Sequence, residues 1–203
     1  MSIPITDAAI ALSGGRLHYL EATPTAPTGS VLLLHGGRFR AQTWRDLGTL
    51  EVLASAGFRA IALDLPGYGD SPRWSGDGAR VLPEVMAALA IARPVLVSPS
   101  MSGRYSLPFV ANQGDLSGFV AVAPVGIPKA LKALQGNPLP TLAIWGERDR
   151  IVPVSQADKL VAALPNAEKV VLTDAGHACY MNQPAAFHDH LLSFVRRCFT
   201  EPL

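Results

Sequence analysis

The chain has 203 residues, of which 49% are hydrophobic and 16% charged, so it can bury a large core and does not have the composition of a disordered protein. We expect one domain over residues 1–203. The formal net charge of +1 and the lack of a Lys/Arg-rich run argue against a nucleic-acid-binding surface held by phosphate contacts.

In chain order, two short strand-like runs over residues 8–21, joined at Ser13-Gly14-Gly15, predict an antiparallel hairpin in which His18 is exposed. The continuous apolar runs that follow are typical of parallel strands buried on both faces of a sheet. These strands are expected at Val31–Leu34, Phe58–Leu63, Pro94–Pro99, Phe119–Val125, Thr141–Trp145 and Lys169–Leu172.

The segments between these strands predict helices, from apolar residues at three- and four-residue steps and from start signals such as Ser155 as an N-cap and Pro184 at N1. The helices are expected at about 43–56, 81–92, from Ser100 to about 112, 128–134, 155–164 and 184–199. Alternating strands and helices predict an α/β fold. Its sheet is mostly parallel with helices on both faces, and the hairpin adds antiparallel strands at one edge.

In such a sheet, binding sites form outside the carboxyl ends of the strands. A serine, an acid and a histidine follow three of the predicted strands, in the chain order Ser100, Asp149, His177. The strand, sharp turn and helix around Ser100 form the pattern of a nucleophile elbow, which exposes a serine hydroxyl at the tip of a strand. The chain order is the one found in α/β-hydrolases.

Three neighbouring serines compete for the position at the tip of the elbow. The turn is so tight that the residues two before and two after the nucleophile must be small. Ser100 has Ser98 and Ser102 at these positions, whereas Ser98 would have Leu96 and Ser102 would have Arg104. We therefore interpret Ser100 as the nucleophile.

An acid and a histidine would have to activate this serine. Asp149 follows a predicted strand by one short turn, where a carboxylate can hold an imidazole in the required tautomer, and Glu147 is the local alternative. His177 lies on a loop that can reach over the sheet toward Ser100. We interpret Asp64 as a structural acid that accepts backbone N–H groups in its own turn.

The other histidines do not suggest a metal site. The neighbours of His35 suggest that it shapes a loop, and His188 and His190 stand two residues apart on a helix, so they face different sides. No zinc-ligand spacing and no glycine-rich phosphate loop occurs in the sequence, so we expect no metal.

A hydrolase of this kind also needs two backbone N–H groups that stabilise a developing oxyanion. One is expected from Met101, at the start of the helix after the elbow, where the helix dipole favours negative charge. The other is expected from Gly37 or Arg38, and the sequence does not decide between these two.

Several stretches of this chain are similar to a known family, above all an elbow with serine flanks where most α/β-hydrolases have glycine. They are Leu32-Leu33-Leu34-His35-Gly36 with Phe39 and Thr43-Trp44, Leu47-Gly48-Thr49-Leu50, Asp64-Leu65-Pro66-Gly67, Ser98-Pro99-Ser100-Met101-Ser102-Gly103, Tyr105-Ser106-Leu107-Pro108-Phe109, and Gly176-His177 with Cys179-Tyr180. With them the chain resembles the α/β-hydrolase superfamily over nearly its whole length and, more narrowly, the small abhydrolase domain-containing 14 proteins.

The resemblance implies that Ser100 is the nucleophile, Asp149 the acid and His177 the base. It also implies activity on small acyl esters and, as an alternative, removal of acyl groups from lysine with coenzyme A as the acceptor. Dehalogenase and epoxide hydrolase activities are disfavoured, because those relatives carry a carboxylate where Ser100 stands.

Larger α/β-hydrolases often insert a cap domain between two of the central strands. Here the corresponding connection, about residues 126–140, is too short for more than one small helix. We therefore expect an open site bounded by Phe39, Met101 and Tyr180 as substrate-contacting residues. An open site suits short acyl groups, or an acylated side chain on a larger partner, better than a long lipid.

The sequence thus predicts a serine hydrolase that needs no cofactor. Acyl transfer to coenzyme A and a non-enzymatic protein-interaction module are the alternatives. The N-terminal residues lack the basic and apolar pattern of a signal peptide, and no apolar run approaches the roughly 20 residues of a membrane span. We expect a soluble cytoplasmic protein that does not bind membranes, with Cys179 and Cys198 as free thiols. Its oligomeric state is left open.

Overall fold

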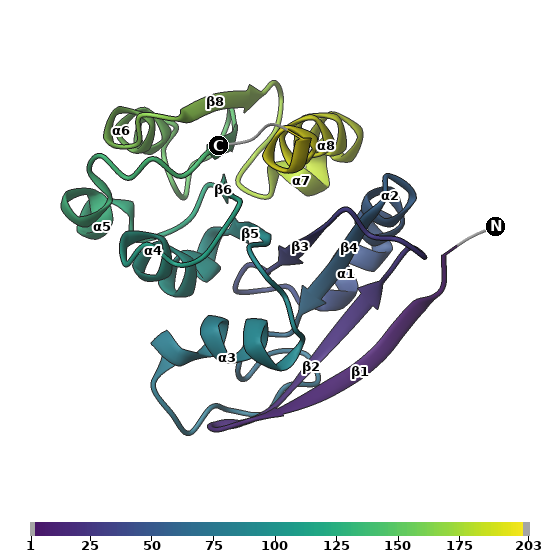
Figure 1. Cartoon of the computed structure of the whole chain (residues 1–203). Coiled ribbons are helices and arrows are strands. Elements are labelled where there is room, and N and C mark those ends of the chain that lie inside the picture. Colours follow the sequence, from purple (N-terminus) through teal and green to yellow (C-terminus); the bar gives the residue numbers. More distant parts are fainter. Residues whose placement is uncertain (1–2, 201–203) are drawn as a thin grey trace.

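Eight strands form one sheet in the order β1-β2-β4-β3-β5-β6-β7-β8 (Figure 1). The strands are β1 (Ile5–Leu12), β2 (Gly15–Ala22), β3 (Gly29–Leu33), β4 (Phe58–Leu63), β5 (Val95–Pro99), β6 (Gly118–Val122), β7 (Thr141–Gly146) and β8 (Ala167–Leu172). The structure is a computed structural model that describes residues 3–200, so residues 1–2 and 201–203 of the predicted domain 1–203 lie outside the described residues.

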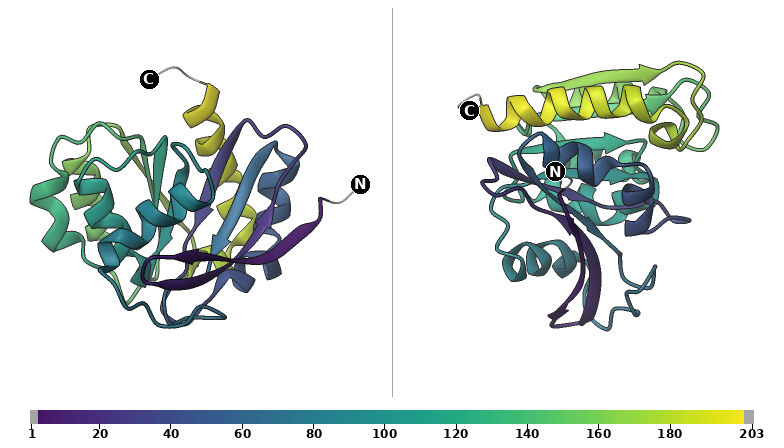
Figure 2. Two further views of the ribbon diagram at one scale, coloured as in Figure 1. Left: turned by 60° about the horizontal axis from the view of Figure 1, so that its bottom comes forward. Right: turned by 90° about the vertical axis from the view of Figure 1, so that its right-hand side faces the viewer.

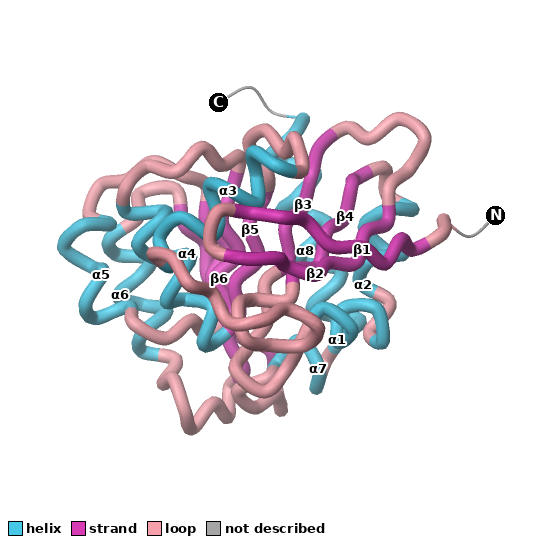
Figure 3. The backbone as a smooth tube through the Cα atoms, turned by 90° about the horizontal axis from the view of Figure 1, so that it is seen from below, coloured by secondary structure: helices cyan, strands magenta, loops and turns pink. Residues whose placement is uncertain are grey.

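The pairing confirms the predicted fold class. The hairpin strands β1 and β2 are antiparallel to each other, and β2 is antiparallel to β4. The remaining pairs are parallel: β4 with β3, β3 with β5, β5 with β6, β6 with β7, and β7 with β8. Figure 3 shows the hairpin running along the edge of the sheet, as the sequence predicts.

Helices cover both faces of this sheet (Figure 2). They are α1 (Ala41–Asp46), α2 (Thr49–Ser55), α3 (Val81–Ala88), α4 (Gly103–Ala111), α5 (Ile127–Leu134), α6 (Ser155–Ala163), α7 (Cys179–Asn182) and α8 (Pro184–Thr200), with short 3-10 turns η1 (Gly78–Arg80) and η2 (Ser100–Ser102). None of these helices within residues 3–200 has the length and hydrophobicity needed to cross a lipid bilayer.

The core has two layers, one on each face of the sheet. Helices α3 to α6 pack on one face, and α1, α2, α7 and α8 pack on the other. The central strands are apolar on both sides because successive side chains point to opposite faces. In β3, for example, Leu32 enters the first layer while Val31 and Leu33 enter the second.

The predicted helix over 43–56 is wrong as a single element. The structure has two helices there, α1 and α2, because Gly48 between them adopts a left-handed backbone with φ of 71°. Such a conformation costs glycine little but interrupts a helix. The apolar periodicity continues across the break because both helices bury residues against the same layer, among them Trp44 and Leu53.

Smaller differences concern the ends of elements. Helix α3 ends at Ala88 instead of residue 92, and Ala90 then has a positive φ of 50°. Strand β6 ends at Val122 instead of Val125, and Ser155 is the first residue of α6 and not its N-cap. Helix α7 is a single turn that has too few residues for a periodic pattern.

The prediction that His18 is exposed is wrong. Its side chain is only 12% exposed, and its ring lies between two carboxylates. His18 Nδ1 is 2.8 Å from Asp64 Oδ2, and His18 Nε2 is 2.9 Å from Asp7 Oδ1. His18 lies on β2, which pairs with β1 on one side and β4 on the other, so it is not on the edge strand of the sheet. Its imidazole is mostly buried because it contacts the buried carboxylate of Asp64.

Asp64 is the structural acid that the sequence predicts, with a wider role. It is buried and accepts the backbone N–H of Asp70 in its own turn at 2.9 Å. It also accepts the backbone N–H of Ala41 at the start of α1, at 2.6 Å. With His18, these contacts tie together β2, the turn after β4 and the first turn of α1.

We predict that His18 stabilises the fold more at low pH than at high pH. Burial disfavours the imidazolium, but the hydrogen bonds and charges of Asp7 and Asp64 outweigh it and raise the pKa of His18. The folded state therefore holds the proton more tightly than the unfolded chain does. This stabilisation is fully present below the unfolded pKa of about 6.5 and is lost as the pH rises through the folded pKa.

His18→Asn should accordingly reduce the free energy of unfolding more at pH 5.5 than at pH 8.5, as measured by urea denaturation. The control is His190→Asn, which changes an exposed histidine on α8. A loss in His18→Asn that does not depend on pH would refute this assignment.

Candidate active site

Ser100 directly follows β5 and is the first residue of the 3-10 turn η2. Its φ is +51°, in the left-handed region that residues other than glycine seldom adopt. Strain of this kind persists only where the surroundings hold it in place, and it is found at functional sites. The turn presents Ser100 at the carboxyl edge of the sheet, where the sequence predicts a nucleophile.

The serines flanking this turn form a buried network of hydroxyl groups. Ser98 Oγ lies 2.9 Å from Ser102 Oγ and 2.6 Å from Ser106 Oγ, and Ser102 donates to the carbonyl of Pro99 at 2.7 Å. All three serine side chains are fully buried. The flanking serines therefore join β5 to η2 and α4, beyond being small enough for the turn.

Sequence reasoning missed Ser106, although the spacing could have indicated it. Ser102 and Ser106 are four residues apart, so at the start of α4 they face the same side. Gly103 brings that helix close to the chain after β6, because a Cβ there would overlap the carbonyl oxygen of Val125. The N–H of Val125 in turn donates to the carbonyl of Ser100 at 2.8 Å.

The structure brings Ser100, His177 and Asp149 together from the ends of three strands. His177 Nε2 lies 2.8 Å from Ser100 Oγ, and His177 Nδ1 lies 2.8 Å from Asp149 Oδ2. The Asp149 side chain is fully buried and that of His177 is 17% exposed. The chain of hydrogen bonds thus runs from a buried carboxylate to a hydroxyl that substrate can reach.

Asp149 is held by both of its oxygens. Oδ2 contacts His177, while Oδ1 accepts the backbone N–H groups of Ile151 at 2.8 Å and Val152 at 2.9 Å. Glu147, the local alternative in the sequence, is exposed and accepts the N–H of Asp174 instead. The structure therefore places Asp149, and not Glu147, beside the histidine.

The loop that carries His177 is fastened to the end of β7. Arg148 donates its backbone N–H to Ala175 at 2.8 Å, and Gly176 donates its own to the side chain of Asn182 at 2.9 Å. Gly146 allows this approach, because a Cβ there would overlap the carbonyl oxygen of Gly176. These contacts fix the position of the loop, and with it that of the His177 imidazole, relative to the end of β7.

A cavity of about 200 Å³ opens onto Ser100 and His177. The loop after β3 lines it with Gly37, Arg38 and Phe39. A Cβ built on Gly37 would be 3.4 Å from the Cβ of Met101, so the predicted oxyanion donors are neighbours. Among the described residues, no protein group accepts the backbone N–H of Gly37 or Arg38.

His35 shapes this loop from below, as the sequence predicts. It is buried, its Nδ1 donates to the carbonyl of Gly36 at 2.8 Å, and its Nε2 accepts the N–H of Leu65 at 2.9 Å. Burial lowers the pKa of His35 and so favours the neutral imidazole that these two roles require.

Aromatic side chains form the far wall of the cavity. Tyr180 stacks on Trp44 with ring centroids 4.9 Å apart and meets Phe39 edge to face at 6.2 Å. Tyr180 itself is buried, and burial raises the pKa of its hydroxyl. The next residue, Cys179, has a free thiol whose pKa burial raises to about 12, so this thiol is not a competing nucleophile at neutral pH.

The sequence of the chain is similar to those of known hydrolases. A profile described as "Alpha/beta hydrolase family" matches residues 31–140, and one described as "alpha/beta hydrolase fold" matches residues 103–184. The chain is 43% identical to "Protein ABHD14A" of Danio rerio, over 89% of this chain and 72% of that protein. It is 40% identical to "Putative protein-lysine deacylase ABHD14B" of Homo sapiens, over 96% of this chain and 97% of that protein.

Solved structures show the same fold at low sequence identity. A predicted CIB-like hydrolase from Thermoplasma acidophilum superposes with a TM-score of 0.91 at 22% identity, covering 96% of this chain and 99% of that one. An esterase from Exiguobacterium antarcticum superposes with a TM-score of 0.79 at 16% identity, covering 94% of this chain and all of that one.

We predict that Ser106→Ala destabilises the fold by about 1–2 kcal/mol, since it removes one partner of a buried hydroxyl network. The measurement is the urea midpoint at constant m-value. Ser55→Ala, which changes an exposed serine on α2, is the control and should stay within about 0.5 kcal/mol. Equal effects of the two variants would show that the network contributes nothing.

Proposed function

Because the chain belongs to the alpha/beta hydrolase family, and within it groups with the ABHD14 proteins, we propose that it is a serine hydrolase of small acyl esters. The observation that carries this proposal is the unbroken chain of hydrogen bonds from Asp149 through His177 to Ser100. A serine whose hydroxyl meets a histidine, which in turn meets a buried acid, is the arrangement of an activated nucleophile.

In the proposed reaction, Ser100 Oγ attacks the carbonyl carbon of the ester while its proton passes to His177 Nε2. The carbonyl oxygen becomes an oxyanion, which the backbone N–H of Met101 and that of Gly37 or Arg38 stabilise. The bond to the alcohol oxygen then breaks, and His177 returns the proton to the leaving alcohol. This leaves an acyl group on Ser100.

Water completes the cycle. It attacks the acyl carbon and gives its proton to His177, and the acid product leaves when the proton returns to Ser100 Oγ. Asp149 holds the imidazole so that Nδ1 carries a proton and Nε2 is free to accept one. Its buried carboxylate also stabilises the imidazolium that forms during each step.

The shape of the site supports short acyl groups. The cavity at Ser100 holds only about 200 Å³, and Phe39 and Tyr180 close its far side. The connection between β6 and β7 contains α5 and no cap domain, so the mouth of the site stays open.

A second candidate function is removal of an acyl group from lysine. The human relative ABHD14B is named a putative protein-lysine deacylase. An acylated lysine on a partner protein could enter the open mouth, which is lined in part by Ile151, a residue that is 68% exposed. Measuring deacylation rates with and without coenzyme A distinguishes acyl transfer to this thiol from hydrolysis.

The cytoplasmic location expected from the sequence stays a prediction.

We predict that Ser100→Ala lowers kcat for a chromogenic short-chain ester by at least about 1,000-fold, because the variant lacks the hydroxyl that forms the acyl-enzyme. The same variant should lose labelling by a fluorophosphonate probe. Ser55→Ala, which changes an exposed serine on α2, should keep both. Unchanged turnover in Ser100→Ala would refute the mechanism, and a folded wild-type protein that never labels would favour a purely binding role.

We further predict that the two oxygens of Asp149 have different roles: Oδ2 supports activity through His177, and Oδ1 supports stability through the backbone. In Asp149→Asn, Oδ1 can still accept the N–H groups of Ile151 and Val152, but the amide favours the wrong tautomer of His177. Activity should fall by about 1,000-fold or more while stability changes little. Asp149→Ala should lose the same activity and also about 1–3 kcal/mol of stability. Equal stability of the two variants would contradict this division.

A further inference from the structure

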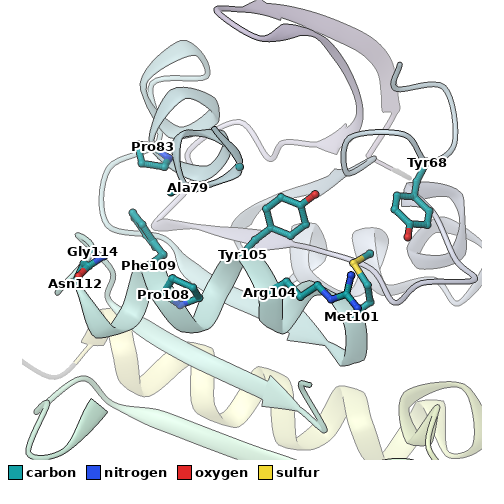
Figure 4. A pocket seen from close by; sticks show the side chains of 11 residues that line it. Tyr68, Ala79, Pro83, Met101, Arg104, Tyr105, Pro108, Phe109, Asn112 and Gly114 are labelled. Atoms are coloured by element: carbon teal, nitrogen blue, oxygen red, sulfur yellow. The ribbon is translucent and has the colours of Figure 1, made fainter. Parts of the chain in front are cut away.

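A second cavity lies beside the active site and shares one wall with it. It holds about 540 Å³, against about 200 Å³ for the cavity at Ser100, and Met101 lines both. The turn after β4, the segment before α3 and one side of α4 form its other walls. In Figure 4, Met101, Arg104 and Tyr105 project into this hollow from the elbow and α4, and Tyr68 faces them from the turn after β4.

The cavity contains one formal charge. Arg104 is its only lining residue that is charged at neutral pH, and no Asp or Glu lines it. No carboxylate among residues 3–200 pairs with Arg104. A single sign of charge against apolar walls raises the local concentration of an oppositely charged ligand. The walls here are largely apolar, with Pro83, Met101 and Phe109 among them.

Two tyrosines add neutral hydrogen-bond donors. Tyr68 and Tyr105 line the cavity, and within the described part of the chain neither hydroxyl has a protein partner. Burial, followed by the nearby Tyr68, raises the pKa of Tyr105 despite the opposing charge of Arg104. Tyr105 therefore keeps its proton near neutral pH. One cation and two hydroxyl donors match a carboxylate, with its single charge, better than a doubly charged phosphate.

The position of Arg104 relates this charge to the reaction. It follows Ser100 by four residues, in the first turn of α4, and Met101 between them lines both cavities. The small cavity already contains Ser100 and His177, so it takes the acyl group. The larger cavity across Met101 is where the remainder of the ester fits.

We propose that the second cavity is the leaving-group subsite, and that it selects esters whose leaving group is an apolar or aromatic body carrying a carboxylate, bound by Arg104. This inference rests on the proposed hydrolysis and adds the class of substrate. The carboxylate lies against the guanidinium, with Tyr68 and Tyr105 as donors, and the apolar body packs on Phe109. Arg104 acts here as a specificity residue and takes no part in the bond-making steps.

A pair of matched esters tests the subsite. 4-Acetoxybenzoate and its methyl ester share the acetyl group, and the phenol that leaves carries a carboxylate in the first and a neutral methyl ester in the second. The measured quantity is the ratio of kcat/KM for the charged ester to that for the neutral one. Comparing this ratio between variants cancels the intrinsic reactivity of the two phenols.

In Arg104→Gln we expect the ratio to fall about fivefold, the size of a partly exposed charge pair. Arg104→Lys should keep part of the preference, because it keeps the charge but not the planar fork. The control is Arg196→Gln, which removes the same charge from exposed Arg196 on α8, on the opposite face of the sheet. Equal falls in Arg104→Gln and Arg196→Gln, or no fall in either, would overturn the proposal.

Binding of the inert product 4-hydroxybenzoate, measured by calorimetry, separates the two levels of inference. Arg104→Gln should weaken this binding about fivefold and leave the melting temperature unchanged. If Arg104 governs binding but neither ester is hydrolysed, the cavity binds carboxylates but is not a leaving-group subsite, and the proposed esterase activity is wrong. If both esters are hydrolysed and neither binding nor the ratio depends on Arg104, the hydrolase stands and the subsite is wrong.

Discussion

The structure depends on one chain of hydrogen bonds that ties the ends of three strands together. Ser100 follows β5, Asp149 follows β7, and His177 follows β8, yet their polar atoms meet at 2.8 Å in both contacts. These contacts require that surrounding groups restrict the rotamer of each side chain, because an unrestrained serine or imidazole would sample many rotamers. Most buried polar groups near the site can be understood as parts of that support.

The support has three parts. Under Ser100, a network of serine hydroxyls joins the strand to the helix and holds a backbone with positive φ. Asp149 accepts backbone N–H groups with Oδ1, and these bonds hold Oδ2 toward His177. Below the loop after β3, His35 holds the segment of Gly37. The side chains in these three parts all have hydrogen-bond partners, which offsets the cost of burying them.

Two cavities of different size lie beside these residues. Aromatic rings line the small cavity at Ser100, whereas the larger one across Met101 carries the guanidinium of Arg104. Both cavities border the same elbow, so one short stretch of chain carries the nucleophile, a predicted oxyanion donor and the charge of the second cavity. The lack of a cap between β6 and β7 leaves both accessible.

Local sequence was enough to predict the strands, because a buried parallel strand must be apolar on both sides and its runs are easily recognised. It also singled out Ser100, since the turn allows only small residues two positions away, and it named the acid and histidine that follow later strands. These features depend on residues close together in the chain. The break at Gly48 was missed because the apolar periodicity continues across it.

Only the tertiary structure could decide which distant groups meet. The contact of His18 with Asp64 spans 46 residues, and no local pattern predicts that a histidine of the hairpin contacts a buried carboxylate. The choice of Asp149 over Glu147 likewise depended on where a loop 28 residues away comes to rest. Sequence alone determined the chemistry available at each strand end. Folding determined which of those groups are neighbours, because long-range contacts are set by packing and by the pairing of buried polar atoms.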